Sequence, residues 1–220
     1  MGHRPAVTVL GAGPSSDRRD EQAFASLQQW VAKGAHLLEV DMGFGPGDTL
    51  LLDAPPGWMA ASICLAAWWV GAAVTDDPSA AELAIVHESR VAAMREAGAG
   101  AALGWVIGDA LDGSTVTPCQ DESWSVAVQS FPDHPPPARA RPDALAIAPR
   151  TGPSCTQAEV LAQARALPAG RLGLRVSQQG ELRSWAVALA ARPAGTGEPS
   201  VLLMAGDESE IAAERISAWV

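Results

Sequence analysis

The stretch GDTLLLDAPPGWMAASICLAAWWVGAAVTDD, residues 47–77, decides the fold of this chain. Its first part, residues 49–53, is an apolar run of the length expected for a strand. Residues 55–57 then read Pro-Pro-Gly and break the strand, because two fixed φ angles and a missing side chain suit a loop. Between residues 58 and 70 only Ser62 is polar, which predicts a helix that is buried on every side.

A second strand follows this helix directly. Gly71 ends the helix, and residues 72–75 form another short apolar run before two aspartates. Two parallel strands that are joined through a helix need a crossover connection, which is right-handed in nearly all known cases. The stretch therefore predicts one strand–helix–strand unit of a parallel α/β sheet.

The same residues resemble the acyl-adenylate-forming enzymes, the AMP-binding superfamily of acyl-CoA synthetases and luciferases. Those proteins read GPGD, then an apolar strand, a proline-bearing loop and an apolar helix that ends in W..GA.V. The matching residues here are Gly45, Pro46, Gly47, Asp48, Pro55, Trp58, Trp69, Gly71, Ala72 and Val74. Residues 24–31, FASLQQWV, look like an earlier helix of that family. The chain is also similar to short, uncharacterised bacterial proteins that keep only the first part of this domain.

The resemblance implies an α/β fold with two lobes of mainly parallel sheet flanked by helices, like a truncated large domain of an AMP-binding enzyme. We expect a first lobe over residues 1–111 and a second lobe over residues 143–220. Residues 112–142 are expected to form an irregular, proline-rich connector. Within it, residues 124–129 alternate in polarity and predict an edge strand.

The other elements are predicted from the period of the apolar residues. A helix is expected over residues 23–40, and further strands over residues 5–10, 82–86, 101–107, 144–148, 170–176 and 201–205. Thr156 and Glu159 have the spacing of a capping box, which predicts a helix start. Asp207 and Glu210 are expected to cap a last helix that carries Ala212, Ile216, Trp219 and Val220 along one face.

Composition excludes some classes of function. The net charge is −10, with a single lysine, Lys33, beside fourteen arginines, so no concentrated positive surface for nucleic acid is visible. Residues 54–75 carry no charge, but the proline–glycine break and the lack of a flanking positive cluster argue against a membrane span. The three cysteines, Cys64, Cys119 and Cys155, show no metal-binding spacing and favour a reducing cytoplasm.

The phosphate loop that the resemblance implies is degenerate. In the resembled enzymes, the strand that corresponds to residues 144–148 leads into TSGTTGxPKG, whose N–H groups and lysine hold phosphates. Residues 150–157 read RTGPSCTQ, so the lysine is absent and Pro153 removes one N–H donor. The later adenine, magnesium and C-terminal lysine motifs of that family are also expected to be missing. We therefore expect no catalytic residues, no metal and no cofactor, and lean against an enzyme.

Three interpretations of function remain open. The first is a non-catalytic remnant that acts as a binding or interaction module, forming a homo-oligomer or joining a partner protein through uncovered sheet edges. The second is a binder of a nucleotide, an acyl group or CoA, with a site lined by Thr151, Gly152, Ser154 and Thr156 at a helix N-terminus. The third is an enzyme subunit whose missing motifs come from a partner.

Overall fold

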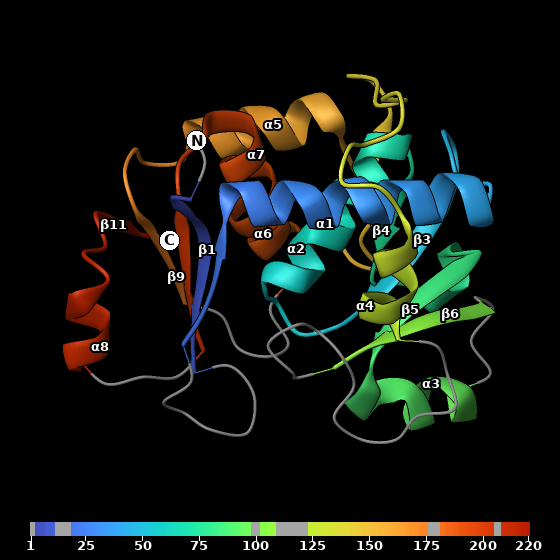
Figure 1. The fold of residues 1–220 in the computed structure, drawn as a ribbon, viewed down its shortest axis with the longest axis horizontal. Helices are drawn as coiled ribbons and strands as arrows, with labels where there is room; N and C mark the ends of the chain where they lie inside the picture. Colours follow the sequence, from blue (N-terminus) through green and yellow to red (C-terminus); the bar gives the residue numbers. More distant parts are fainter. Residues whose placement is uncertain (1–2, 12–18, 98–101, 109–122, 176–180, 205–207) are drawn as a thin grey trace.

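A computed structural model describes residues 3–11, 19–97, 102–108, 123–175, 181–204 and 208–220. Two mainly parallel sheets stand on either side of a layer of helices (Figure 1). The first sheet has the strand order β11-β9-β10-β1-β2, and the second has the order β6-β5-β3-β4-β7-β8. The predicted α/β class, with two mainly parallel sheets flanked by helices, is confirmed.

The first sheet joins strands from the two ends of the chain. Its strands are β1 (Pro5–Leu10), β2 (Arg19–Ala23), β9 (Leu172–Arg175), β10 (Ser200–Leu203) and β11 (Ala218–Trp219). The central pair is β1 with β10, which run parallel, while β2 pairs antiparallel with β1 and forms one edge. The short strand β11 forms the other edge beside β9.

The second sheet holds the strands around the deciding stretch. They are β3 (Thr49–Asp53), β4 (Ala73–Thr75), β5 (Leu83–His87), β6 (Ala102–Ile107), β7 (Leu145–Ile147) and β8 (Cys155–Thr156). The strand β3 pairs in parallel with both β4 and β5, as the predicted crossover requires. Side chains alternate along β3, so that Leu50 and Leu52 join the large core whereas Leu51 faces the opposite side of the sheet.

Helix α2 (Trp58–Val70) is the buried helix that the sequence predicts. All but two of its thirteen residues are buried, and it ends at Gly71, whose φ of 89° is left-handed. It packs against α1 (Phe24–His36), which continues into a π-helical turn at Leu37–Asp41. It also contacts β1 in the first sheet and β4 in the second. One continuous core therefore links the two sheets through α2.

Two helices cover the outer faces of the sheets (Figure 1). Helix α3 (Val91–Ala97) places Val91 and Met94 against Leu51, Val86 and Val106 of the second sheet. Helix α8 (Glu208–Ala213) belongs to a smaller cluster on the outer side of the first sheet. The layers therefore run helix, sheet, helices, sheet, helix. The other helical segments are η2 (Pro78–Ala80), η3 (Glu88–Arg90), α4 (Trp124–Ala127), η4 (Val128–Ser130), α5 (Gln157–Ala166), α6 (Leu182–Ala186), η5 (Val187–Ala191) and α7 (Arg192–Thr196).

The edge strand predicted over residues 124–129 is wrong. This segment forms α4 and then a 3₁₀ turn. Trp124, Ala127 and Val128 are its buried apolar residues, and they stand at i, i+3 and i+4, which is a helical spacing. The indole of Trp124 packs edge-to-face on Trp105, with ring centroids 5.4 Å apart. Packing against distant residues therefore decides the structure of this segment.

The predicted last helix through Val220 is also wrong in its second half. Helix α8 ends at Ala213, and β11 follows, with Val220 N donating to Gly173 O at 3.0 Å. Gly173 makes this pairing feasible, because a Cβ there would lie 2.6 Å from the ring of Trp219. The proposed cap residue Asp207 lies outside the described residues.

The sheet pairing crosses the predicted lobes. Strands β7 and β8, which follow the proline-rich segment, pair into the sheet of β3 and β4, and β1 pairs with β10. The division into residues 1–111, 112–142 and 143–220 stays a prediction about how the chain is organised.

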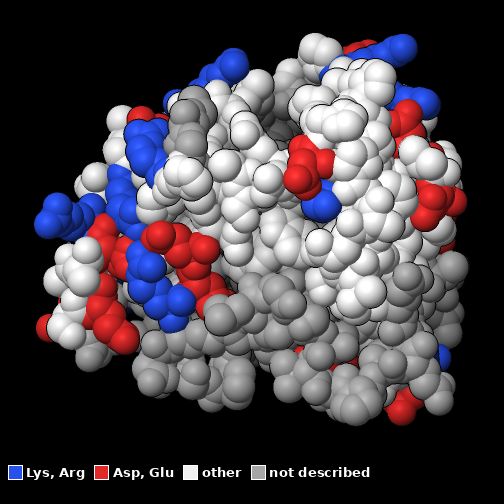
Figure 2. All heavy atoms as spheres, viewed as in Figure 1, with Lys and Arg blue, Asp and Glu red and all other residues white. Residues whose placement is uncertain are grey.

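Charged side chains gather over the first sheet, at the left of Figure 2, whereas the middle of this face carries few of them. Arg19 donates to Glu214 at 2.6 Å and to Glu21 at 2.5 Å. Arg171 donates to Thr8 at 2.9 Å and also to Glu214. This network ties β1, β2 and β9 to the segment after α8.

A buried arginine closes the end of the central helical layer. Arg192 is 1% exposed, and its guanidinium donates to the carbonyl oxygens of Pro168 (2.8 Å), Gly170 (2.6 Å) and Pro199 (2.5 Å). These carbonyls precede β9 and β10, so one side chain fixes the start of two strands. A buried guanidinium is tolerated where its donors are satisfied in this way.

We expect Arg192→Met to lower the free energy of unfolding by about 3–5 kcal/mol, because it removes the guanidinium from three carbonyls, of which Pro199 O keeps a bond from Leu172 N. Urea unfolding followed by circular dichroism measures this loss. The exposed Arg165→Met change is the matched control and should cost no more than about 0.5 kcal/mol. A loss below about 1 kcal/mol for Arg192→Met would contradict the role given to this side chain.

Candidate functional site

The residues predicted to line a phosphate loop lie together in one turn between β7 and α5. Thr151, Gly152 and Ser154 are exposed, and Thr156 is half-buried at the start of α5. Gly152 has a φ of 92°, and a Cβ there would have nothing within 4 Å. A glycine is therefore needed here for the left-handed turn, and not because a neighbouring group approaches closely.

The hydroxyl of Thr156 is used by the helix that it begins. It accepts a hydrogen bond from Glu159 N at 3.3 Å and donates to the Glu159 carboxylate at 3.0 Å. The same carboxylate accepts from Thr156 N at 2.8 Å. The predicted capping box is confirmed. The bond from the Thr156 backbone, followed by the bond from its side chain, lowers the pKa of Glu159 below its ordinary value.

The N-terminal donors of α5 are bonded within the protein. Gln157 N donates to Ala144 O and Ala158 N to Pro142 O, each at 2.9 Å, while Glu159 N donates to Thr156. A helix N-terminus attracts anions through free N–H groups together with the helix dipole. At α5 the first three of these groups already have acceptors, so a phosphate at this helix end would compete with the protein for them.

Two further donors near the loop are also engaged or missing. Arg150 N donates to the carboxylate of Asp76 at 2.6 Å. Pro153 has no N–H to offer. The lone lysine, Lys33, lies on α1, where its Nζ donates to Phe131 O at 2.8 Å and pairs with Asp133 at 3.1 Å.

Other reactive side chains have structural partners. His87, at the end of β5, is buried, and its Nδ1 lies 2.8 Å from the Ser89 hydroxyl. Burial raises the pKa of the Cys64 thiol far above its usual range.

Among the described residues, no three acidic, histidine or cysteine side chains are placed to hold a metal ion. No helix in the described part of the chain has the length and apolar character to span a membrane.

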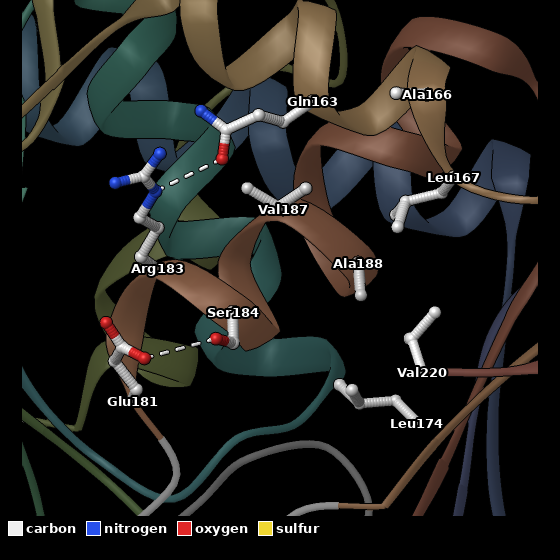
Figure 3. A pocket seen from close by; sticks show the side chains of 10 residues that line it. All are labelled: Gln163, Ala166, Leu167, Leu174, Glu181, Arg183, Ser184, Val187, Ala188 and Val220. Atoms are coloured by element: carbon white, nitrogen blue, oxygen red, sulfur yellow. Dashed lines mark hydrogen bonds between the residues drawn. The ribbon is translucent and has the colours of Figure 1, made fainter.

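A pocket of about 610 Å³ opens between α5, α6 and β9 (Figure 3). Its polar end holds Arg183, whose Nε donates to Gln163 at 3.1 Å, and the pair Glu181 and Ser184. Its other end is apolar and includes Leu167, Leu174, Val187, Ala188 and Val220. The sequence alone does not predict this pocket, because its walls come from four segments that meet only in the fold.

Two adjoining hollows form a second concave surface, which we call the α2 trough. Their volumes are about 530 and 640 Å³, and both are lined by Leu65, Trp69 and Ala194. The walls come from α1, α5 and α7 and from residues 133–135 and 140–142. The sequence predicts residues 58–70 to be buried on every side, and in the structure Leu65 and Trp69 are only partly buried.

Comparison with solved structures decides the fold family. A Brucella canis acyl-CoA synthetase superposes with a TM-score of 0.74 at 16% identity, covering 98% of this chain and 43% of that one. A long-chain-fatty-acid-CoA ligase from Archaeoglobus fulgidus gives a TM-score of 0.70 at 15% identity, covering 97% and 46%. The described fold is the fold of part of an acyl-CoA synthetase. The resemblance that the sequence suggested is confirmed at this level.

Sequence comparison finds similarity to a bacterial protein over part of the chain. A Mycobacterium tuberculosis protein that is named only for a numbered family is 30% identical over 78 residues, which are 36% of this chain and 32% of that protein. No family model matches the chain. The match thus spans about a third of that relative, and this chain spans less than half the length of the two synthetases.

We expect Thr156→Ala to lower the free energy of unfolding by about 1 kcal/mol at neutral pH, through loss of the helix cap. Because Glu159 has a lowered pKa in the folded state, its bonds stabilise the fold above its ordinary value of 4.5 and are lost as pH falls through the lower, folded value. The difference between Thr156→Ala and the parent should therefore shrink in acid. Chemical unfolding over a pH series tests this, and Ser154→Ala, at an exposed position, is the control. A difference that stays constant into acid would contradict it.

Proposed function

We propose that this chain is a binding module built on the acyl-CoA synthetase fold, and that it does not form acyl adenylates by itself. One observation carries the proposal: the N–H groups that begin α5 donate to Ala144, Pro142 and Thr156. Those groups stand where the resemblance places the phosphate loop, and here they hold the helix in place. A triphosphate placed on these N–H groups would have to displace protein hydrogen bonds before it gained its own.

Charge at the turn supports the same conclusion. Polyphosphate sites gather cations and free N–H groups around several negative charges. This turn offers the exposed guanidinium of Arg150, while the carboxylate of Asp76 is fixed beside it by the Arg150 N–H. Lys33, on α1, donates to Phe131 O and pairs with Asp133, so it is not part of this turn. One cation beside one carboxylate near Thr151 would therefore attract a polyphosphate only weakly.

A small-molecule binder is the second candidate function. The pocket of Figure 3 supports it, because about 610 Å³ lies within the range of ligand sites, and its apolar walls meet a few polar groups at one end. The ligand classes under this candidate are a nucleotide, an acyl group or CoA, held here or at Thr151, Gly152, Ser154 and Thr156. An enzyme subunit that is completed by a partner is the remaining alternative, since the chain spans less than half of the compared synthetases. A cytoplasmic location stays a prediction.

We expect no ATP-dependent pyrophosphate exchange by the purified chain with a panel of carboxylic acids, because the N–H groups that begin α5 already have acceptors in the protein and the turn has no lysine. Robust exchange with any acid would overturn the proposal. An intact acyl-CoA synthetase, run in parallel with its own acid, shows that the assay detects the reaction.

Thermal unfolding with ATP, AMP and CoA separates the first two candidate functions. A ligand at a hundred times its Kd adds about 2.7 kcal/mol to the free energy of unfolding, which raises the Tm by several degrees in a chain of this size. The interaction module predicts no shift with any of the three. A shift that Arg183→Gln removes would favour the pocket of Figure 3 and the small-molecule function.

Self-association also remains a proposal. The first sheet has charged or short edges: β2 carries Arg19 and Glu21, and β11 has two residues. Such edges resist pairing with a second chain. A homodimer built on the first sheet would therefore have to use an exposed face of that sheet's layer and not a strand edge.

We expect light scattering to give the mass of a dimer that dissociates on dilution. A monomer mass at every concentration would rule out the homodimer and leave a different partner protein.

A further inference from the structure

The α2 trough has an apolar floor made of large residues and small ones. Trp68 donates its indole N–H to Ala146 O at 2.7 Å, and Trp69 donates to Pro136 O at 2.8 Å. Both polar atoms are therefore satisfied inside the protein, and the part of each ring that meets the trough is apolar. The exposed Ala158 and Ala194 also line it, so the backbone of a partner could approach closely at these positions.

The rim of the trough is positive although the chain as a whole carries a net charge of −10. Arg141 and Arg165 line the larger hollow and are exposed. In the part of the chain that the structure describes, neither guanidinium has a carboxylate within ion-pair distance. The acid at the other end of the trough, Asp133, is paired with Lys33. The trough therefore presents two uncompensated cations beside an apolar floor.

We propose that the α2 trough binds an acidic amphipathic helix of a partner protein. The proposal rests on the proposed function as a binding module and names the class of its partner. A helix of this kind lays apolar residues at i, i+3, i+4 and i+7 into a hydrophobic groove. Its flanking carboxylates would face Arg141 and Arg165. Tryptophan and arginine are also the residues that most often dominate the energy of protein interfaces.

A second copy of this chain fits the trough less well. Among the described helices, α8 carries two acidic residues in its first turn, Glu208 and Glu210, whereas α5 carries one, Glu159, which is used in its capping box. Its apolar residue Ile211 already packs against Leu10, Val201 and Leu203 of the first sheet. The apolar side of α8 is therefore already buried within its own molecule. For this reason we choose a different protein as the occupant of the trough.

A display library of helical segments about 20 residues long, tiled across the proteome of the source organism, tests the proposal on the purified chain; at this length a helix spans about 30 Å. We expect the selected segments to carry apolar residues at helical spacing, flanked by Asp and Glu. The double change Arg141→Glu with Arg165→Glu should weaken the binding of each purified segment about tenfold or more, since two attractions become repulsions.

Two further variants separate the trough from other surfaces. Ala158→Glu fills the trough with a like charge near the start of α5, where an acidic residue suits the helix dipole, and should also abolish binding. Arg215→Glu makes the charge change of one member of the double variant at an exposed position after α8 and should leave binding unchanged. All variants must keep the urea midpoint of the parent, which shows that they fold.

Several outcomes would overturn the trough proposal. They are no enrichment of acidic amphipathic segments, enrichment of basic ones, or equal binding by the Arg141→Glu/Arg165→Glu and parent chains. The proposed function fails differently, because pyrophosphate exchange would refute it whatever the trough binds.

Discussion

The structure depends on the burial of one helix that has no polar side. Helix α2 is apolar around its whole circumference, so nearly all of its surface must be kept from water, and only Leu65 and Trp69 in the α2 trough stay partly exposed. A single sheet can cover only one side of a helix. Here β4 and β1 belong to different sheets and both contact α2, while α1 and the π-helical turn at Val187–Ala191 cover most of the rest of it. The five layers follow from this requirement, because each sheet then needs a helix on its outer face.

The position of α5 connects this architecture to the function. Helix α5 is anchored where β7 and β8 join the second sheet, and it is held there by Thr156, by Gln157 N on Ala144 and by the Gln157 side chain, which donates to Trp68 O at 2.9 Å. These bonds pin α5 to α2 and to the strand before it. The same groups would have to be free in a phosphate-binding turn. A phosphate at the N-terminus of α5 would therefore compete with the bonds that fix this helix.

The elements that could be predicted from the sequence are those whose signal is local. The strand–helix–strand unit around α2 is complete within thirty residues, and the capping box of Thr156 needs only its own helix. The errors fall where distant contacts decide. Trp124 becomes helical on packing against Trp105, and Trp219 becomes a strand residue beside Gly173. The pairing of β1 with β10 cannot be predicted from the residues of either strand alone.

The candidate sites divide in the same way. Thr151, Gly152, Ser154 and Thr156 are close in sequence, and the structure keeps them in one turn. The α2 trough could not be predicted, because Trp68 and Trp69 have the pattern of core residues. Whether their rings are covered depends on how far α5 and α7 stand apart. In the described structure Gly195 sets part of that spacing, since a Cβ there would lie 2.2 Å from Leu161.

Native-state hydrogen exchange tests most directly whether α2 is the element that both sheets share. The account predicts that amides of α2, of β1 and β10 in the first sheet, and of β3 and β5 in the second become exposed in one event with the free energy of global unfolding. Exchange at low denaturant that exposes one of the two sheets while α2 and the other sheet stay protected would contradict it.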